Sequence, residues 1–235
     1  MQNLEETTAV ILAGGLGTRL RSLVPDHQKV VAMVGGKPFV TYVLDALDYY
    51  CFRTVVLCVG YLGDQVQTAL GSRYKGMQLL YSREPEPLGT GGALRLALPF
   101  LTSEQILILN GDSFCQADLI AFWNFHLKRQ SVATLLLVEV EDTSTFGKVE
   151  IDSTGRVTSF NEKGQSGQGL VNAGVYLIQR KLLETIPEGI CSIEKDIFPK
   201  WAGKELQGYR CHGKFLDIGT PSSYSASQRF FDLPG

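Results

Sequence analysis

The sequence predicts an α/β fold in which a mixed, mainly parallel sheet lies between two layers of helices. Short apolar runs alternate with stretches of helical periodicity up to about residue 130. Two of these runs, residues 54–59 and 105–109, are apolar after their first residue, which is typical of strands buried on both faces. The first run ends in a glycine-rich loop, as in the strand–loop–helix units of parallel sheets.

The front part of the chain predicts alternating strands and helices. The strands are expected at residues 8–13, 54–59, 77–81 and 105–109, and the helices at 38–52, 64–70, 91–98 and 117–129. This order favours parallel strands joined by helices on the two faces of the sheet.

The pattern changes after residue 130 to longer strands and shorter helices. Strands are expected at 132–140 and 170–178, a hairpin at 148–160 turning at 152–155, and short helices near 181–185 and 193–202. Residues 206–211 and 214–218 are predicted to pair with one another as closing strands. Pro221 suits the first turn of a last helix reaching about Phe231. No linker or repeat interrupts the chain, so residues 1–235 are expected to form a single domain.

Composition excludes several classes of protein. The net charge is −2, which gives no basic excess for a polyanion, so no nucleic-acid partner is expected. No run approaches the ~20 apolar residues of a membrane span, and the acidic start is unlike a signal peptide. Five cysteines without a C-x-x-C pair favour reduced thiols. We therefore expect a cytoplasmic protein with no membrane partner.

Glycine is the unusual component. The chain has 25 glycines in 235 residues, above the usual share of about 7%. Gly14, Gly15 and Gly17 follow the first strand, where glycines let backbone N–H groups approach a phosphate or a base. The loop fits neither the dinucleotide fingerprint, which needs glycine where Leu20 stands, nor the P-loop, which needs a G-K-[ST] ending. Its cations are Arg19 and, ten residues later, Lys29.

The stretch 12–20, together with Lys29, resembles the opening motif of the sugar-1-phosphate nucleotidyltransferases, also called nucleotide-sugar pyrophosphorylases. Six further segments resemble motifs of this family in the same order: residues 87–93, 109–112, 146–149, 160–163, 171–176 and 215–221. The likeness thus spans nearly the whole chain. Within the family, Arg19-Leu20-Arg21-Ser22 is most similar to the D-glycero-α-D-manno-heptose 1-phosphate guanylyltransferases.

The resemblance implies a Rossmann-like, three-layer nucleotide-diphospho-sugar transferase fold of the GT-A-like kind. It further implies a nucleotide-binding half over about 1–130 and a sugar-binding half over about 131–235. The family joins a nucleoside triphosphate, here GTP by resemblance, to a sugar 1-phosphate and releases pyrophosphate. Both substrates are anions, so catalysis needs cations and a divalent metal, Mg²⁺, to hold them together. Relatives of this kind often form homo-oligomers.

The resemblance also assigns a role to individual residues. Arg19 and Lys29 would be catalytic. The nucleotide would contact Leu12, Ala13, Gly14, Gly15, Gly17, Thr18, Gly89, Thr90 and Gly111. The sugar phosphate would contact Asn110, Gly147, Glu162, Lys163 and Asn172. Asp112 and Asp217 would hold Mg²⁺, which suits one or two carboxylates with phosphate oxygens and water.

One segment departs from the family pattern. The family has proline-lysine-proline around the second cation, whereas this chain has Gln28-Lys29-Val30, so the cation is kept and a rigid frame is predicted to be lost. This departure motivates an alternative of another class, a non-catalytic sensor of nucleotides or sugar phosphates. Within the enzyme class, mannose 1-phosphate guanylyltransferase and glucose-1-phosphate nucleotidyltransferase activities remain alternatives. No side chain is identified from the sequence as the reader of the base.

Overall fold

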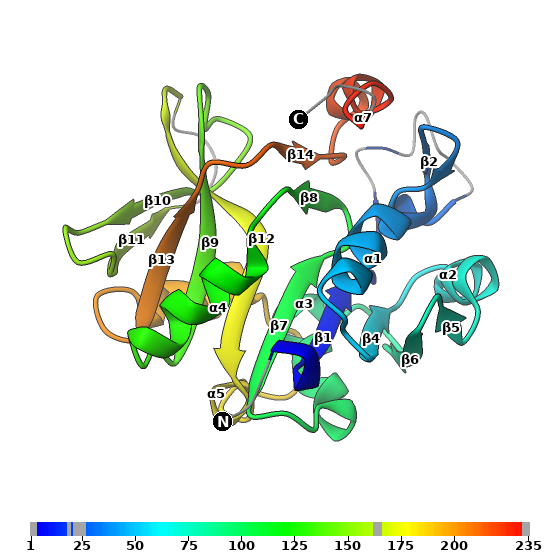
Figure 1. The fold of residues 1–235 in the computed structure, drawn as a ribbon, viewed down its shortest axis with the longest axis horizontal. Coiled ribbons are helices and arrows are strands. Elements are labelled where there is room, and N and C mark those ends of the chain that lie inside the picture. Colours follow the sequence, from blue (N-terminus) through cyan, green and yellow to red (C-terminus); the bar gives the residue numbers. More distant parts are fainter. Residues whose placement is uncertain (1–3, 18–19, 21–26, 162–165, 232–235) are drawn as a thin grey trace.

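The computed structural model describes residues 4–17, 20, 27–161 and 166–231. Its main sheet has ten strands, and eight follow the order β11-β10-β12-β7-β1-β4-β6-β5 (Figure 1). The parallel part consists of β1 (Thr8–Leu12), β4 (Thr54–Val59), β6 (Met77–Arg83) and β7 (Gln105–Asn110). The short β5 (Arg73–Tyr74) pairs antiparallel with β6 at the edge.

The remaining strands extend the same sheet in antiparallel and parallel pairs. β12 (Gly169–Gln179) lies antiparallel to β7 and also to β9 (Ala133–Val140). β10 (Lys148–Ile151) and β11 (Val157–Asn161) form the expected hairpin beside β12. β12 therefore joins the front and back halves of the chain in one sheet.

Each face of the sheet is covered by helices, which confirms the three-layer prediction. In register, Ile11, Leu57 and Leu109 point to one face, where α1 (Val40–Tyr49), α2 (Gly63–Leu70) and α4 (Leu119–Lys128) pack. The strand side chains that alternate with these point to the other face, which is covered by α3 (Gly89–Ala97), α5 (Arg180–Leu183) and α6 (Phe198–Trp201). Both faces of the central strands are therefore buried, which explains why their interiors are apolar.

Short one-turn segments complete the chain between these elements. They are η1 (Leu4–Glu6), η2 (Lys29–Val31), η3 (Leu98–Phe100) and a π-turn, η4 (Ile193–Ile197), which leads into α6. A small hairpin of β2 (Met33–Val34) and β3 (Lys37–Pro38) precedes α1. None of the helices in the described part of the chain combines the length and apolarity that a membrane crossing requires.

The predicted pairing of the last two strands is wrong. β13 (Leu206–Cys211) lies parallel to β9 in the main sheet, whereas β14 (Phe215–Asp217) pairs antiparallel with β8 (Ser113–Cys115). The two strands bury their side chains in different places. Leu206 belongs to the core beneath the sheet, and Leu216 belongs to a separate cluster with Phe39. This β8–β14 arm lies above the carboxyl ends of the parallel strands in Figure 1.

The last helix is shorter than predicted. α7 (Pro221–Ser227) begins with a Thr220 capping box and ends before the two phenylalanines. Phe231 stacks on Tyr42 with 3.4 Å between ring centroids, and Phe230 packs edge-on against Phe114. The two partly buried rings thus pack against α1 and β8 just beyond the end of the helix.

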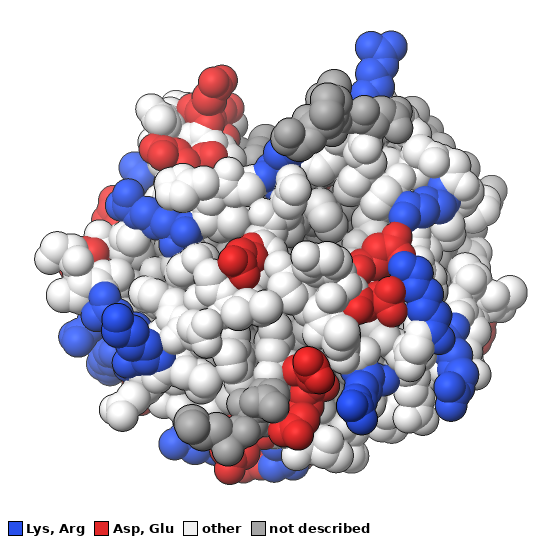
Figure 2. Space-filling view, viewed as in Figure 1, with Lys and Arg blue, Asp and Glu red and all other residues white. Residues whose placement is uncertain are grey.

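The charged side chains are mixed in sign over the molecular surface. In Figure 2, Lys and Arg atoms alternate with Asp and Glu atoms, and neither sign covers the face that is drawn. Several of these charges are paired; for example, Asp45 lies within an ion-pair distance of both Lys37 and Lys75. This mixture agrees with the small net charge of −2.

Candidate active site

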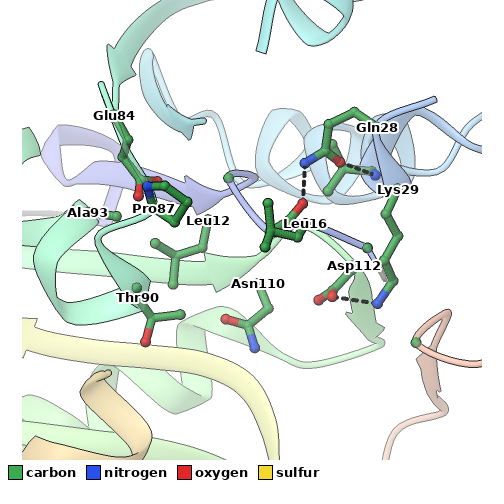
Figure 3. Close-up of a pocket in the computed structure, with 16 residues that line it drawn as sticks. Leu12, Leu16, Gln28, Lys29, Glu84, Pro87, Thr90, Ala93, Asn110 and Asp112 are labelled. Atoms are coloured by element: carbon green, nitrogen blue, oxygen red, sulfur yellow. Dashed lines mark hydrogen bonds and ion pairs between the residues drawn. The ribbon is translucent and has the colours of Figure 1, made fainter. Parts of the chain in front are cut away.

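The carboxyl ends of the parallel strands open into a cavity of about 370 Å³. β1 leads into Gly14 and β6 into Glu84, and both residues line the cavity. Asn110, the last residue of β7, and Asp112 line it as well, as Figure 3 shows together with Glu84. Crevices at the carboxyl ends of parallel strands are where open α/β sheets bind ligands. The cavity is lined by Leu12, Gly14, Gly15, Leu16, Gly17, Gln28, Lys29, Val30, Glu84, Pro87, Gly89, Thr90, Ala93, Asn110, Asp112 and Gly219.

Three glycines at this edge of the sheet, Gly14, Gly17 and Gly111, have close neighbours or a backbone angle that bears on their identity. A Cβ at Gly14 would lie 2.3 Å from Glu84 Oε1, and a Cβ at Gly111 would lie 2.9 Å from the carbonyl oxygen of Leu12. Gly17 has a positive φ of 59°, which favours glycine. A Cβ at Gly111 would thus press on backbone and the φ of Gly17 favours glycine, whereas the crowding at Gly14 comes mainly from the end of the Glu84 side chain.

The side chain of Gln28 is hydrogen-bonded to the backbone of the glycine loop. Its side chain is buried, and its Nε2 donates to the carbonyl oxygens of Ala13 and Gly15, each at 2.8 Å. Its Oε1 accepts from Val30 N at 3.0 Å, and its own backbone N donates to Gln65 Oε1 at 2.8 Å. The segment that lacks the family's prolines is thus held by four hydrogen bonds that involve Gln28.

Lys29 carries a positive charge into the cavity. Its Nζ lies 2.6 Å from Asp112 Oδ2, and its side chain is 11% exposed. Because the side chain is so enclosed, its ammonium group could contact a phosphate only if a ligand entered the cavity. The ion pair therefore marks the place where an anionic group would compete with Asp112.

Asp217 lies next to Asp112 through the β8–β14 arm. Ile218 N donates to the carbonyl oxygen of Asp112 at 3.0 Å, and Asp217 Oδ1 accepts from Gly219 N at 2.6 Å. In the described residues, no cluster of three or more His, Cys, Asp or Glu side chains could hold a metal. Two neighbouring carboxylates still fit Mg²⁺, because that ion takes one or two carboxylates and completes its shell with water and phosphate.

The second glycine segment begins α3. Gly89 has a positive φ of 72°, and its Cβ would lie 2.6 Å from the carbonyl oxygen of Cys191. The backbone N–H groups of Gly91 and Gly92 both donate to that same oxygen, at 2.8 and 3.1 Å. Thr90 Oγ1 donates to Glu194 Oε2 at 2.5 Å and accepts from Ile193 N. The helix start is thereby attached to the segment that leads into α6.

A second cavity, of about 640 Å³, adjoins the first. The two cavities share Lys29, Asn110 and Asp112. The second is further lined by Thr145, Phe146, Gly147, Phe160, Asn172, Ser192, Glu194, Lys195, Asp217, Thr220, Ser222 and Ser223. Two ligands, one in each cavity, would therefore lie next to each other at Lys29, Asn110 and Asp112.

A chain of hydrogen bonds through the buried Tyr176 connects Asn172 and Glu194, which both line the second cavity. Asn172 Nδ2 donates to the hydroxyl of Tyr176 at 2.7 Å, and that hydroxyl donates to Glu194 Oε1 at 3.3 Å. Asn172 Oδ1 accepts from Gly174 N. Burial raises the pKa of Tyr176 well above its ordinary value, so its hydroxyl remains protonated. The Oδ1 of Asn110 is buried and has no protein hydrogen-bond partner among the described residues.

The predicted site residues fall into three groups. Leu12, Gly14, Gly15, Gly17, Lys29, Gly89, Thr90, Asn110, Asp112, Gly147, Asn172 and Asp217 line one or both cavities. Ala13 and Gly111 lie just behind, where Ala13 accepts from Gln28 and Gly111 N donates to Leu12 O at 2.9 Å. Thr18, Arg19, Glu162 and Lys163 lie outside the described residues.

Sequence reasoning missed Gln28, Glu84, Tyr176 and Glu194 as site residues. Glu84 had an available signal, because it directly follows β6 and so lies at the ligand-binding edge of the sheet. Its Oε2 accepts from Leu88 N at 2.8 Å, and burial raises its pKa above the ordinary value. Glu194 had no such signal, since its contact with Thr90 joins residues 104 positions apart.

Comparisons with known proteins agree with this geometry. The family described as "Nucleotidyl transferase" matches residues 8–232. A D-glycero-alpha-D-manno-heptose 1-phosphate guanylyltransferase from Aneurinibacillus thermoaerophilus is 36% identical over 224 residues, covering 94% of this chain and 96% of its own. A mannose-1-phosphate guanylyltransferase catalytic subunit beta from Drosophila melanogaster is 35% identical over 93% of this chain, which spans 61% of that relative.

A solved structure extends the likeness to the fold. HddC from Yersinia pseudotuberculosis, complexed with GMP-PN, superposes with a TM-score of 0.86 at 32% identity over 96% of this chain and 99% of that chain. The expected nucleotide-diphospho-sugar transferase fold is confirmed by these likenesses. The chain belongs to the nucleotidyl transferase family.

Proposed function

We propose that the chain condenses GTP with D-glycero-α-D-manno-heptose 1-phosphate to give GDP-heptose and pyrophosphate. The observation that carries this proposal is the pair of adjoining cavities that meet at Lys29, Asn110 and Asp112. The first would take the nucleotide and the second the sugar phosphate, so that the two phosphates meet at the shared residues. The heptose relative and the GMP-PN complex of HddC support this choice of substrates.

Glu84 supports guanine as the base. Its carboxylate lies against Gly14 at the first cavity and would accept hydrogen bonds from a base bound there. Guanine offers two adjacent donors, N1–H and N2–H₂, whereas uracil and thymine place a single N–H between two carbonyl oxygens that a carboxylate repels. A carboxylate is an acceptor with two oxygens, so its chemistry matches the guanine edge.

The residues of the chain would bring two anions together in line. Lys29 would leave its ion pair with Asp112 and neutralise charge on the α-phosphate as the sugar phosphate oxygen attacks the α-phosphorus. Arg19 would hold the triphosphate and Lys163 the sugar phosphate. Asp112 and Asp217 would hold Mg²⁺, which when bound supplies further positive charge to the phosphate oxygens. The bond from the α-phosphorus to pyrophosphate breaks as the new P–O bond forms.

The second cavity would read the sugar by its hydroxyl groups. Asn172 and Glu194 lie on the cavity wall with their polar atoms already oriented by Tyr176 and Thr90. Gly147 would leave space for the ring, and Glu162 would accept a further hydroxyl. Sites built to pair hydroxyls discriminate strongly, because a wrong sugar leaves buried polar groups unpaired.

The two halves of the chain would thus divide the work, with residues 1–130 binding the nucleotide and 131–235 the sugar. We place this reaction in the cytoplasm, because the five cysteines are unpaired thiols, which fit a reducing compartment. A homo-oligomer is proposed from the resemblance to the family.

A substrate panel tests the proposal. Pyrophosphate release is measured with GTP, ATP, CTP, UTP and dTTP, each against heptose, mannose and glucose 1-phosphates, with Mg²⁺ and with a chelator. The expected result is fastest release with GTP and the heptose phosphate, abolished by the chelator. Preference for mannose or glucose 1-phosphate would replace the sugar, and GTP binding without any turnover would favour the non-catalytic sensor.

A further inference from the structure

We propose that Gln28 is a positioning residue that holds the glycine loop and Lys29 in one fixed arrangement. The inference deepens the proposed function, on which its kinetic predictions rest. Gln28 replaces a proline of the family pattern, and its side chain is 2% exposed. The chain therefore buries an amide at a position where the family pattern predicts a rigid ring.

All the polar capacity of this amide is directed at backbone. Its two N–H bonds go to two carbonyl oxygens, those of Ala13 and Gly15, and its oxygen accepts the Val30 N–H. A flipped amide would place its oxygen against two carbonyl oxygens and its NH₂ against a donor. The orientation is therefore determined by the partners.

The two bonded carbonyls lie on either side of Gly14. Glu84 Oε1 lies 2.3 Å from the position that a Cβ of Gly14 would take, so Gly14 lies close to Glu84 as well as between the two carbonyls that Gln28 binds. In a trans peptide the C=O and N–H groups point in opposite directions. The N–H groups of Gly14 and Leu16 therefore point away from Gln28, and a nucleotide in the cavity could accept them.

The third hydrogen bond connects the loop to the cation. Val30 N lies in the first turn of η2, and Lys29 projects from that same turn to Asp112. Gln65 of α2 supports the turn from outside by accepting the backbone N–H of Gln28. A single side chain thus fixes both the loop that would bind the nucleotide and the lysine that would act on it.

Two substitutions at Gln28 keep the size of the side chain and change its hydrogen bonds. Gln28→Glu replaces both donors with an oxygen that faces two carbonyls, and Gln28→Met removes all three bonds. Both leave the backbone bond to Gln65 intact. The matched controls are Gln78→Glu and Gln78→Met, at an exposed glutamine on β6.

The first measurement is the Kd for GTP without sugar phosphate, by calorimetry, with the melting temperature of each variant as a check on folding. We expect Gln28→Glu to weaken GTP binding about 10-fold or more, Gln28→Met less, and the Gln78 controls not at all. The second measurement is turnover, where we expect kcat to fall about 100-fold with little change in the KM of the sugar phosphate.

The outcomes separate this inference from the proposed function. Unchanged GTP binding and turnover in folded Gln28 variants overturns the positioning role, as does failure of both variants to fold, which would make Gln28 a residue of the core. If the wild type binds GTP but never turns over, the proposed reaction fails while the GTP titrations still decide the role of Gln28. If the wild type binds no GTP, both are overturned.

Discussion

At the residue scale, Glu84 is the side chain that we propose reads the base. Its carboxylate is half-buried beside Gly14, with Oε2 accepting from Leu88 N. We expect Glu84→Gln to raise the KM for GTP about 10- to 100-fold, because hydrogen bonds to a charged group are worth about 1.5–3 kcal/mol. The NH₂ of glutamine can also donate to a carbonyl oxygen, so the relative use of UTP and dTTP should rise.

The exposed Glu86, two residues further on, provides the matched control. Glu86→Gln makes the same loss of charge outside the cavity and should leave the KM for every nucleotide unchanged. Competition between GTP and UTP in one reaction measures the preference directly. Equal nucleotide preferences in wild type and Glu84→Gln would show that Glu84 does not read the base.

Among the described residues, Lys29 is the basic side chain that lines both cavities. Lys29→Met should lower kcat about 100-fold or more, since it removes a charge that stabilises the transition state. The melting temperature should change little, because Asp112 keeps contact with water at 35% side-chain exposure. Lys37→Met, which breaks a surface ion pair with Asp45, is the control and should retain full activity. A Lys29→Met enzyme with normal kcat would remove Lys29 from the mechanism.

The residues that could be predicted from the sequence belong to local motifs. Asp112 lies two residues after β7 and Lys29 follows the glycine loop, and the resemblance of these segments to family motifs gives both residues their predicted roles. Gln28 and Glu194 could not be predicted, because their roles depend on partners brought close only by folding. Glu194 contacts Thr90 across 104 positions of sequence. At position 28 the sequence shows only that the proline ring is missing, and not the hydrogen bonds that glutamine forms in the folded chain.

At the element scale, the start of α3 depends on close contact with the segment before η4. A Cβ at Gly92 would lie 2.3 Å from the carbonyl oxygen of Gly189 and 2.8 Å from Leu88 Cβ. Gly92→Ala must therefore push backbone apart, which typically costs about 1–3 kcal/mol of unfolding free energy. The displaced helix start carries Thr90, so the KM for the nucleotide should rise as well.

Urea unfolding and nucleotide kinetics measure the two effects on the same protein. Gly76→Ala is the control, because a Cβ there meets nothing within 4 Å. A Gly92→Ala protein as stable as wild type would mean that the 189–191 segment yields without cost.

Elements were predictable in proportion to how completely they are buried in the main sheet. β4 matches the prediction at both ends, and β1 and β7 match within one residue, because the interior of each strand is an uninterrupted apolar run. In the β8–β14 arm, β14 lies within the predicted strand 214–218 but pairs with another partner, and β8 is not predicted. Each of these strands has three residues and buries part of its surface in a small cluster apart from the sheet. Such short pairs have no periodicity, yet this one brings Asp217 beside Asp112.

At the scale of the whole molecule, the two halves of the chain meet along β7 and β12. Leu109 pairs with Val175 across this boundary, and the site residues Asn110 and Asn172 lie on the two strands. A substrate that bridges both cavities therefore contacts both halves, and binding should stabilise the chain as one unit. The seven motifs suggested this arrangement, but only the pairing of β7 with β12 gives it a physical cause.

His126 connects three elements across the same boundary and makes folding dependent on pH. It lies on α4, fully buried, with Nδ1 2.7 Å from Thr134 Oγ1 of β9 and Nε2 2.9 Å from Gln105 Oε1 of β7. Burial lowers its pKa to about 4, below the ordinary 6.5. Below pH 6.5 the unfolded chain takes up a proton that the folded chain does not, so stability is lost as the pH falls toward 4.

The expected loss from this single group is about 2 kcal/mol at pH 5 relative to pH 7.5, where both states are neutral. Other groups titrate in the same range, so the variant His126→Gln, which cannot take up the proton, serves as the reference. Unfolding free energies from urea are compared at pH 7.5, 6.5 and 5. The advantage of wild type over His126→Gln should shrink steadily across this series, and a constant difference would show that His126 titrates equally in the folded and unfolded chain.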